Sequence, residues 1–322
     1  MYRRHAWREA LAVWSAECIA NRPDVLYLDH LDALLYREAT PDIPAVIDLH
    51  NVYSLLVKRT AQEQINVFRR VFLNSEARKL DRIERCAVRE CQLTCAVSDA
   101  EAAHFRELDA NMVHVVPNGV DCATFADIPI GRDGPPMMMF LGTMSWGPNA
   151  SAARFLAREV FPVIRKRIPD AVLTIVGREP PADLLLLNGT PGIEVTGGVA
   201  DVKPYLSRAS VLTVPLDAGG GTRLKILEAF AAGLPVVSTA IGAEGIAAEP
   251  NVHYVCAERP VFAEMTADLL TDHEKAARMA KLARELAYEA YDWSRIGQKA
   301  VNVVLSGGNC KTLGNAGLSP EI

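Results

Sequence analysis

A run of glycines at 219–221 is followed at once by residues that could hold an anion. Arg223 and Lys225 come next in the chain, and Glu228 lies three residues past Lys225. We predict a helix that starts after the glycine turn with Thr222 as its N-cap, a position that threonine favours. The free N–H groups and positive dipole end of a helix N-terminus suit a phosphate group. Cations in the first turn oppose this dipole, so Arg223 and Lys225 fit best beside a bound anion.

The acidic Glu228 lies one turn deeper on the same face as Lys225. Its carboxylate could accept hydrogen bonds from sugar hydroxyls while phosphates occupy the glycine turn. The alternative interpretation is an ordinary surface pair between Lys225 and Glu228, with no ligand. The apolar runs 211–216 and 235–239 flank the turn and helix, which predicts a helix that connects two buried parallel strands.

The segment 211–239 resembles the donor-site signature of the family 4 glycosyltransferases, which are retaining, metal-independent enzymes with two facing Rossmann-like domains, the GT-B fold. The resemblance implies that the donor diphosphate is approached by the turn, which consists of Gly219, Gly220, Gly221 and Thr222. It implies that Glu228 binds the nucleotide ribose. Many members carry another glutamate eight residues earlier, where this chain has Gly220. The chain resembles instead a subgroup with a Gly-Gly-Gly-Thr-Arg turn, so sugar contacts must come partly from backbone amides.

The loop 142–149 also belongs to the donor site by this resemblance, beginning with Gly142. Many family members place an arginine and a lysine in this loop to neutralise the diphosphate, and this chain has neither. Arg223 and Lys225 must then carry that task and stabilise the leaving diphosphate. Asn149, at the end of the loop, is predicted to be the N-cap of the next helix.

A histidine near the transferred sugar is a further feature of the family. His50 ends the apolar run 45–50, at the carboxyl edge of a predicted strand, where open α/β sheets bind ligands. We therefore include His50 with Arg223 and Lys225 among the candidate catalytic residues. A histidine satisfied within a loop is the open alternative. His30 follows an earlier strand in the same way.

The elements that must position these residues are short apolar runs that alternate with helical stretches. This pattern is typical of an α/β protein with parallel sheets covered on both faces. Four runs come first, at 25–30, 45–50, 93–98 and 113–119. Six follow, at 137–142, 171–177, 193–197, 211–216, 235–239 and 253–257.

The Pro- and Gly-rich stretch 127–136 predicts a linker between two domains. We expect an acceptor-side Rossmann-like domain at 1–125 and a nucleotide-sugar-binding one at 126–293. A C-terminal helix at 294–305 and a disordered tail at 306–322 would follow. Family members usually begin with a strand and a glycine-rich loop, whereas this chain opens with a predicted helix at 8–20. We therefore expect the first domain to be incomplete and the chain to be N-terminally short.

The composition fits a folded globular protein, because half of the 322 residues are hydrophobic and 23% are charged. The formal net charge of −5 argues against nucleic-acid binding, which favours basic domains. No apolar run is long enough to span a membrane, and the first residues lack the apolar core of a signal peptide. The seven cysteines form no C-x-x-C pair, which indicates reduced thiols in the cytoplasm.

The segment 58–90 is basic, with nine Lys/Arg against five Asp/Glu. Apolar residues recur in it at roughly helical spacing, namely Phe68, Val71, Phe72, Leu80 and Ile83. A basic amphipathic helix can lie on an anionic membrane, at the inner face for a cytoplasmic protein. The alternative is a helix whose apolar side is core and whose charges are solvated.

Taken with the resemblance, these features predict a glycosyltransferase of polysaccharide biosynthesis. It would move a sugar from a nucleotide diphosphate donor, UDP- or GDP-linked, to a glycan or lipid-linked acceptor. The sequence has no Asp-x-Asp motif in a metal-binding context, so we expect no metal and no cofactor besides the nucleotide-sugar substrate. Two alternatives stay open: a non-catalytic nucleotide-sugar-binding remnant and a nucleotide-sugar 2-epimerase, which has the same fold.

Overall fold

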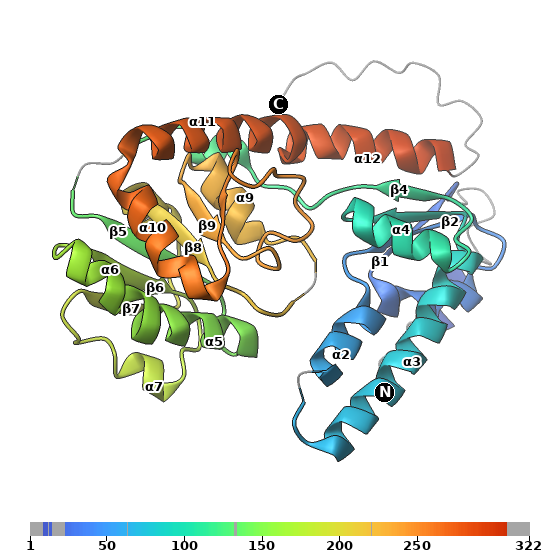
Figure 1. Cartoon of the computed structure of the whole chain (residues 1–322). Helices are drawn as coiled ribbons and strands as arrows, with labels where there is room; N and C mark the ends of the chain where they lie inside the picture. Colours follow the sequence, from blue (N-terminus) through green and yellow to red (C-terminus); the bar gives the residue numbers. More distant parts are fainter. Residues whose placement is uncertain are drawn as a thin grey trace. The chain divides into compact units, whose positions relative to one another are not determined.

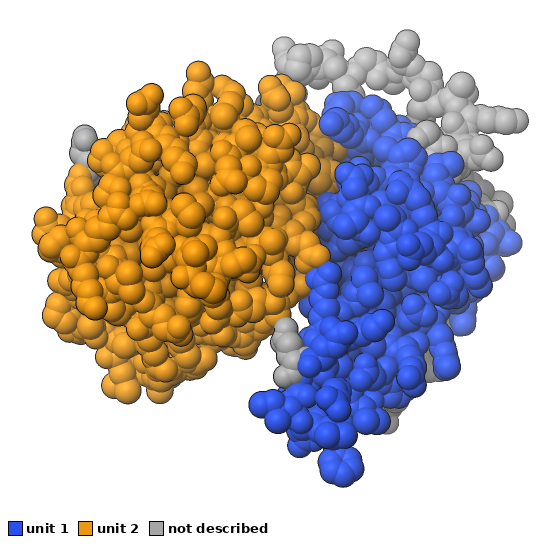
Figure 2. Space-filling model, in the orientation of Figure 1, with its two compact units in different colours: residues 1–116, 297–322 blue, residues 117–296 orange. Residues whose placement is uncertain are grey.

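The computed structural model describes residues 9–11, 13–14, 23–62, 64–131, 134–219 and 221–307. Two compact units make up the chain (Figure 2): unit 1 comprises residues 1–116 and 297–322, and unit 2 comprises 117–296. Of the helix expected at 8–20, residues 9–11 and 13–14 are described and helical. The tail expected at 306–322 lies outside the described residues from 308 onward.

Unit 1 contains a four-stranded parallel sheet in the order β1-β2-β3-β4. Its strands are β1 Leu26–Asp29, β2 Ala45–Leu49, β3 Leu93–Ala96 and β4 Val113–Val115. Between residues 23 and 116 its helices are η1 Leu31–Ala39, α2 Tyr53–Gln62, α3 Val67–Glu90 and α4 Asp99–Glu107. Every residue of β2 and β3 is buried, as expected for central strands covered on both faces.

Helices α2 and α3 form an antiparallel pair that extends away from the sheet of unit 1 (Figure 1). The side chain of Asn66 caps α3 by accepting a hydrogen bond from the Arg69 N–H, 3.1 Å away. Ser98 caps α4 in the same way, with the Glu101 N–H as donor at 3.3 Å. These local caps set where the two helices begin.

Unit 2 contains a six-stranded parallel sheet in the order β10-β9-β8-β5-β6-β7. The strands are β5 Met137–Leu141, β6 Val172–Val176, β7 Ile193–Gly197, β8 Val211–Val214, β9 Val236–Ser238 and β10 Val255–Cys256. Counted from β5, this is the strand order of the doubly wound Rossmann fold, which reverses between the first and fourth strands. All ten predicted strands thus form, four in unit 1 and six in unit 2.

Helices cover both faces of the unit 2 sheet (Figure 1). They are η2 Cys122–Phe125, α5 Gly147–Phe155, η3 Leu156–Val160, α6 Phe161–Arg167, α7 Ala182–Leu185, α8 Lys203–Arg208, α9 Leu224–Ala231, η4 Arg259–Val261, α10 Phe262–Thr271 and α11 His273–Ala290. The large core between the layers includes Met138, Phe140, Leu212 and Phe230, all fully buried.

The boundary between the units lies at 116/117, earlier than the expected position near residue 125. Val120 pairs with Asp292, and Phe125 and Ile128 are buried in the core of unit 2. The described residues 127–131 and 134–136 therefore group with unit 2.

The C-terminal helix α12, Trp293–Gly307, begins one residue before the expected range. Its residues from Gly297 onward belong to unit 1, where Val303 and Val304 pack against Val46 and Leu93. Contacts between residues far apart in the sequence thus decide which unit a segment belongs to. The sequence pattern alone does not show these contacts. Among the described helices, none has the length and apolar character needed to cross a membrane.

Candidate functional site

The strand order of unit 2 reverses between β5 and β8, and the predicted donor residues follow these two strands. Gly142 comes directly after β5, and the loop after β8 leads to Gly219 and Gly221. Ligands of open α/β sheets bind outside the carboxyl ends of the strands at such a reversal. The fold therefore places these glycines at the position where a ligand is expected. Gly220 lies outside the described residues.

Two glycines of the site allow close packing that a side chain would prevent. A Cβ atom at Gly142 would lie 2.6 Å from Nδ2 of Asn149. A Cβ atom at Gly219, where φ is +147°, would overlap the side chains of Arg223 and Trp146. Both loops thus depend on glycine to bring the backbone against polar and aromatic side chains.

Helix α9 begins at Leu224 with Arg223 as its N-cap, so the prediction of Thr222 as N-cap is wrong. Arg223 is buried, donates a hydrogen bond from Nη1 to the Gly221 carbonyl at 3.1 Å, and lies with Cζ 5.8 Å from the centre of the Trp146 ring. The packing of this guanidinium fixes Arg223 in a non-helical conformation. The Thr222 hydroxyl is buried and makes no hydrogen bond to any described residue.

Lys225, in the first turn of α9, is held by a residue far away in the sequence. Its Nζ donates a hydrogen bond to Oδ1 of Asn149 at 2.9 Å and lies 4.7 Å from the centre of the Phe140 ring. Nδ2 of Asn149 in turn donates to the Thr143 carbonyl, also at 2.9 Å. Burial lowers the pKa of Lys225 to about 7, with a smaller contribution from the positive charge of Arg223.

The predicted helix N-cap role of Asn149 is therefore wrong. The helix after this loop is α5, and its N-cap is Trp146, so Asn149 lies inside the first turn. Asn149 is buried there and positions Lys225 instead. Because the two residues are 76 positions apart, only the tertiary structure brings them together.

Glu228 lies on α9 and is half-buried. Burial raises the pKa of its carboxyl group, and the nearby charge of Lys225 partly offsets this effect. Within the described chain, Lys225 and Glu228 form no ion pair. The surface pair that was the alternative interpretation is thus absent from the described chain.

His50 lies in unit 1, at the carboxyl end of β2, where it is surrounded by polar groups. Its Nε2 lies 3.1 Å from Oδ1 of Asp29 and 3.7 Å from Oδ2 of Asp48, and its ring stacks on that of His30 with centres 4.2 Å apart. Burial raises the pKa of Asp48, which accepts a hydrogen bond from the Tyr27 hydroxyl. Asp29, His30 and His50 could together hold a metal ion, because one ligand atom of each lies within 4.8 Å of the others. In the described part of the chain, no other three His, Cys, Asp or Glu residues lie this close together.

Sequence reasoning did not include Asp29 or Trp146. A signal for Asp29 exists: Asp29-His30 and Asp48-x-His50 end two neighbouring strands, and Asp29 pairs with Asp48 in the register of β1 and β2. Parallel strands end at the same edge of a sheet, so this juxtaposition was predictable once the two strands are paired. Trp146 gives no such signal, because its contact with Arg223 depends on the folding of two loops.

Comparisons with known proteins agree with this geometry. Residues 2–124 match the family described as Glycosyltransferase Family 4, and residues 135–272 match the family described as Glycosyl transferases group 1. One match covers most of each unit. The chain therefore belongs with the GT-B glycosyltransferases of the family 4 type.

Individual relatives are distant in sequence. A phosphatidyl-myo-inositol mannosyltransferase of Mycolicibacterium smegmatis is 28% identical over 239 residues, which are 70% of this chain and 59% of that protein. The chain thus spans about three fifths of the length of this relative.

Two solved structures share the fold. The sucrose-phosphate synthase of Thermosynechococcus elongatus matches with a TM-score of 0.71 and 17% identity, over 92% of this chain and 76% of that one. The Anabaena protein Alr3699/HepE, in a complex with UDP, matches with a TM-score of 0.72 and 18% identity, over 93% and 82%.

Proposed function

We propose that this protein is a retaining, metal-independent glycosyltransferase that uses a UDP- or GDP-linked sugar and a glycan or lipid-linked acceptor. The observation that carries the proposal is the pair of cations, Arg223 and Lys225, at the N-terminal end of α9 beside the reversal of strand order in unit 2. The UDP in the Anabaena structure supports a uridine donor for this chain.

The donor diphosphate would bind between the glycine turn and the start of α9. Arg223 and Lys225 would stabilise the negative charge that develops on the diphosphate as the bond to the sugar breaks. Such preorganised charges are usually the largest contribution to catalysis. A diphosphate would also restore the full charge of Lys225, whose pKa burial lowers to about 7.

Glu228 and His50 complete the proposed set of functional residues. The Glu228 carboxylate would accept hydrogen bonds from the ribose hydroxyls of the donor. His50 would contact the transferred sugar or the acceptor. Its neighbour Asp29, 3.1 Å away, would hold the imidazole in one orientation and one tautomer, as carboxylates commonly do for functional histidines.

Contact with an anionic membrane is part of this proposal, because five apolar side chains are exposed where α2 and α3 meet. This apolar tip consists of Ile65, Val67, Phe68, Val71 and Phe72. Phe68 is 86% exposed, and Val71 and Phe72 are exposed too, so these three residues are not core, whereas Leu80 packs against the core of unit 1. Arg69 and Arg70 lie between them in the sequence, and an apolar surface with basic neighbours suits an anionic lipid surface at the inner face of a membrane.

A thermal-shift screen against UDP-, GDP- and ADP-sugars tests the donor site first, since a ligand that binds only the folded state raises the melting temperature. Product analysis with the best donor then separates the candidates. A transferase moves the sugar to an added acceptor, and a 2-epimerase converts the donor without one. A non-catalytic binding protein shifts the melting temperature but leaves the donor unchanged. No shift with any nucleotide-sugar would contradict the donor site itself.

A further inference from the structure

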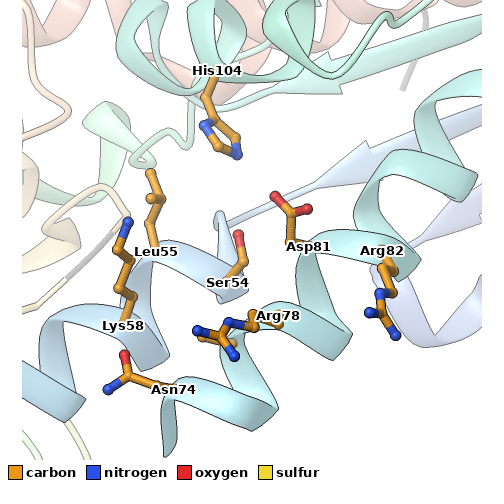
Figure 3. Close-up of a pocket in the computed structure, with 9 residues that line it drawn as sticks. Ser54, Leu55, Lys58, Asn74, Arg78, Asp81, Arg82 and His104 are labelled. Atoms are coloured by element: carbon orange, nitrogen blue, oxygen red, sulfur yellow. The ribbon is translucent and has the colours of Figure 1, made fainter.

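Unit 1 contains a cavity that takes no part in the proposed donor site. It has a volume of about 490 Å³ and lies among α2, α3 and α4. Figure 3 shows side chains from the three helices around it; they include Ser54, Lys58, Arg78, Asp81, Arg82 and His104. Cavities of roughly 300–1,000 Å³ are the usual size of small-molecule sites.

The rim of this cavity is positively charged. Lys58, Arg78 and Arg82 are exposed, and within the described chain none of the three forms an ion pair. The one acidic residue at the rim, Asp81, lies 3.8 Å from Arg85 on the same helix. The three cations therefore face solvent with their charges uncompensated, an arrangement that favours a dianion such as a phosphate group.

The interior of the cavity offers polar groups that lack partners. Ser54 is only 5% exposed, and its hydroxyl lies beside the carboxyl group of Glu84, whose Oε2 has no hydrogen-bond partner among the described residues. Nε2 of His104, which enters from the opposite side (Figure 3), likewise makes no hydrogen bond to any described residue. Behind them, Glu84 is fully buried and accepts a hydrogen bond from the Ser54 N–H at 3.1 Å. Buried polar groups of native proteins are normally paired, so such orphans indicate a missing ligand or water.

We propose that this cavity binds a small phosphorylated sugar or polyol. The phosphate would lie at the rim against Lys58, Arg78 and Arg82, where guanidinium groups can form paired hydrogen bonds to phosphate oxygens. The hydroxyl groups of the same molecule would reach Ser54 and His104 in the interior. An unphosphorylated sugar would lack the rim contacts, and inorganic phosphate would leave the interior groups unpaired.

Isothermal titration of the full chain with glucose 6-phosphate, glucose and inorganic phosphate tests this proposal. We expect glucose 6-phosphate to bind more tightly than either of the other two compounds. Lys58→Gln and Arg78→Gln should each weaken its binding by about tenfold, the effect of losing a hydrogen bond to a charged group. Ser54→Ala should weaken glucose 6-phosphate binding while leaving the weaker binding of inorganic phosphate unchanged.

Two control variants separate this cavity from other basic sites. Lys79→Gln removes a neighbouring cation of α3 that does not line the cavity and pairs with Glu76 at 2.6 Å. Lys225→Gln removes a cation of the proposed donor site in unit 2. Both should bind glucose 6-phosphate as the unmodified chain does. The proposal is overturned if glucose 6-phosphate does not bind, or if Lys58→Gln and Arg78→Gln bind it as tightly as the controls do.

Discussion

The amine of Lys225 occupies a site where a lysine is hard to keep charged. Its Nζ is held by one amide oxygen of Asn149 and lies over the face of Phe140, while the guanidinium of Arg223 is close enough to lower its pKa. A buried cation without an anion usually loses its proton or recruits a counter-charge. The protonation state of Lys225 should therefore respond to an anionic ligand in unit 2.

We predict that UDP binding takes up a proton at about pH 8 and much less at about pH 6. Lys225, with a pKa of about 7, is mostly neutral at the higher pH and mostly charged at the lower pH. A bound diphosphate favours the ammonium form and raises this pKa. Titration calorimetry in two buffers of different ionisation enthalpy measures the uptake. Lys225→Met should abolish it, and equal uptake by this variant would show that another group is responsible.

A second prediction for a single residue concerns Glu228. Glu228→Ala should weaken nucleotide-sugar binding by about 1–3 kcal/mol, because donor hydroxyls would lose their buried acceptor. The melting temperature of the free protein should hardly change, since Glu228 forms no ion pair within the described chain. Glu285→Ala, an exposed glutamate of α11, is the matched control and should leave binding intact. Unchanged donor affinity in the Glu228 variant would contradict the ribose role.

At the scale of elements, the donor site rests on the loops that follow β5, β6 and β8. Gly177, directly after β6, has a φ of +154°, and a Cβ atom there would overlap the backbone carbonyl of Gly142. The strand ends are therefore packed backbone against backbone. This contact supports the loop that leads from Gly142 into α5, where Asn149 holds Lys225.

Gly177→Ala should destabilise unit 2 by at least about 1 kcal/mol, because the backbone is forced to move from a conformation that alanine rarely adopts. Donor affinity should fall as well, since Gly142 and its loop must shift. Denaturant unfolding and UDP titration measure the two effects. Gly189→Ala meets no atom within 4 Å and is the control, with stability near that of the unmodified chain. Equal stability of the two variants would show that the strand ends tolerate the added methyl group.

Residues at the ends of the paired strands β1 and β2 could bind a metal ion, whereas we propose that the enzyme needs none. Donor binding and sugar transfer should survive EDTA, because Arg223 and Lys225 supply the positive charge at the diphosphate. The group Asp29, His30 and His50 could hold a metal ion, so this expectation needs its own test. Activity that is lost in EDTA and restored by Mn²⁺ or Zn²⁺ would contradict the proposal. If the added ion then failed to restore the activity of Asp29→Asn, the ion would be assigned to this group.

At the scale of the whole molecule, unit 1 exposes a group of apolar side chains that lie close together in the sequence. Unit 2 has one continuous core, whereas unit 1 exposes the apolar tip of α2 and α3. Exposed apolar groups that lie together usually mark an interaction surface, while single ones are common. We therefore expect the apolar tip to be an interaction surface of unit 1.

The full chain should sediment with vesicles that contain phosphatidylglycerol and much less with vesicles of phosphatidylcholine alone. The apolar tip would enter the interface and the neighbouring arginines would meet the anionic headgroups. Replacing Phe68 and Phe72 by Ser should reduce binding severalfold, and rising salt should weaken it. Leu186→Ser removes a single exposed apolar residue of unit 2, 83% exposed, and is the control. Equal binding by both variants would exclude the tip as the contact.

Much of the fold follows from the sequence by itself. Each of the ten strands is a short apolar run, because parallel strands covered on both faces must be apolar throughout. The glycines and cations after β8 predict an anion site, because their chemistry is local to one turn and one helix start. The spacing of apolar residues along α3 also predicts a helix from local sequence. It does not tell which of these residues are buried.

The tertiary structure alone decided how these residues are used. Thr222 is a suitable N-cap by type, but the packing of Arg223 on Trp146 moves the helix start to the next residue. Asn149 looks like a cap and instead holds Lys225. The unit boundary, the strand order that reverses between β5 and β8, and the cavity among α2, α3 and α4 depend likewise on contacts between distant segments. A local pattern encodes propensity and chemistry, but such pairings form only when the whole chain has folded.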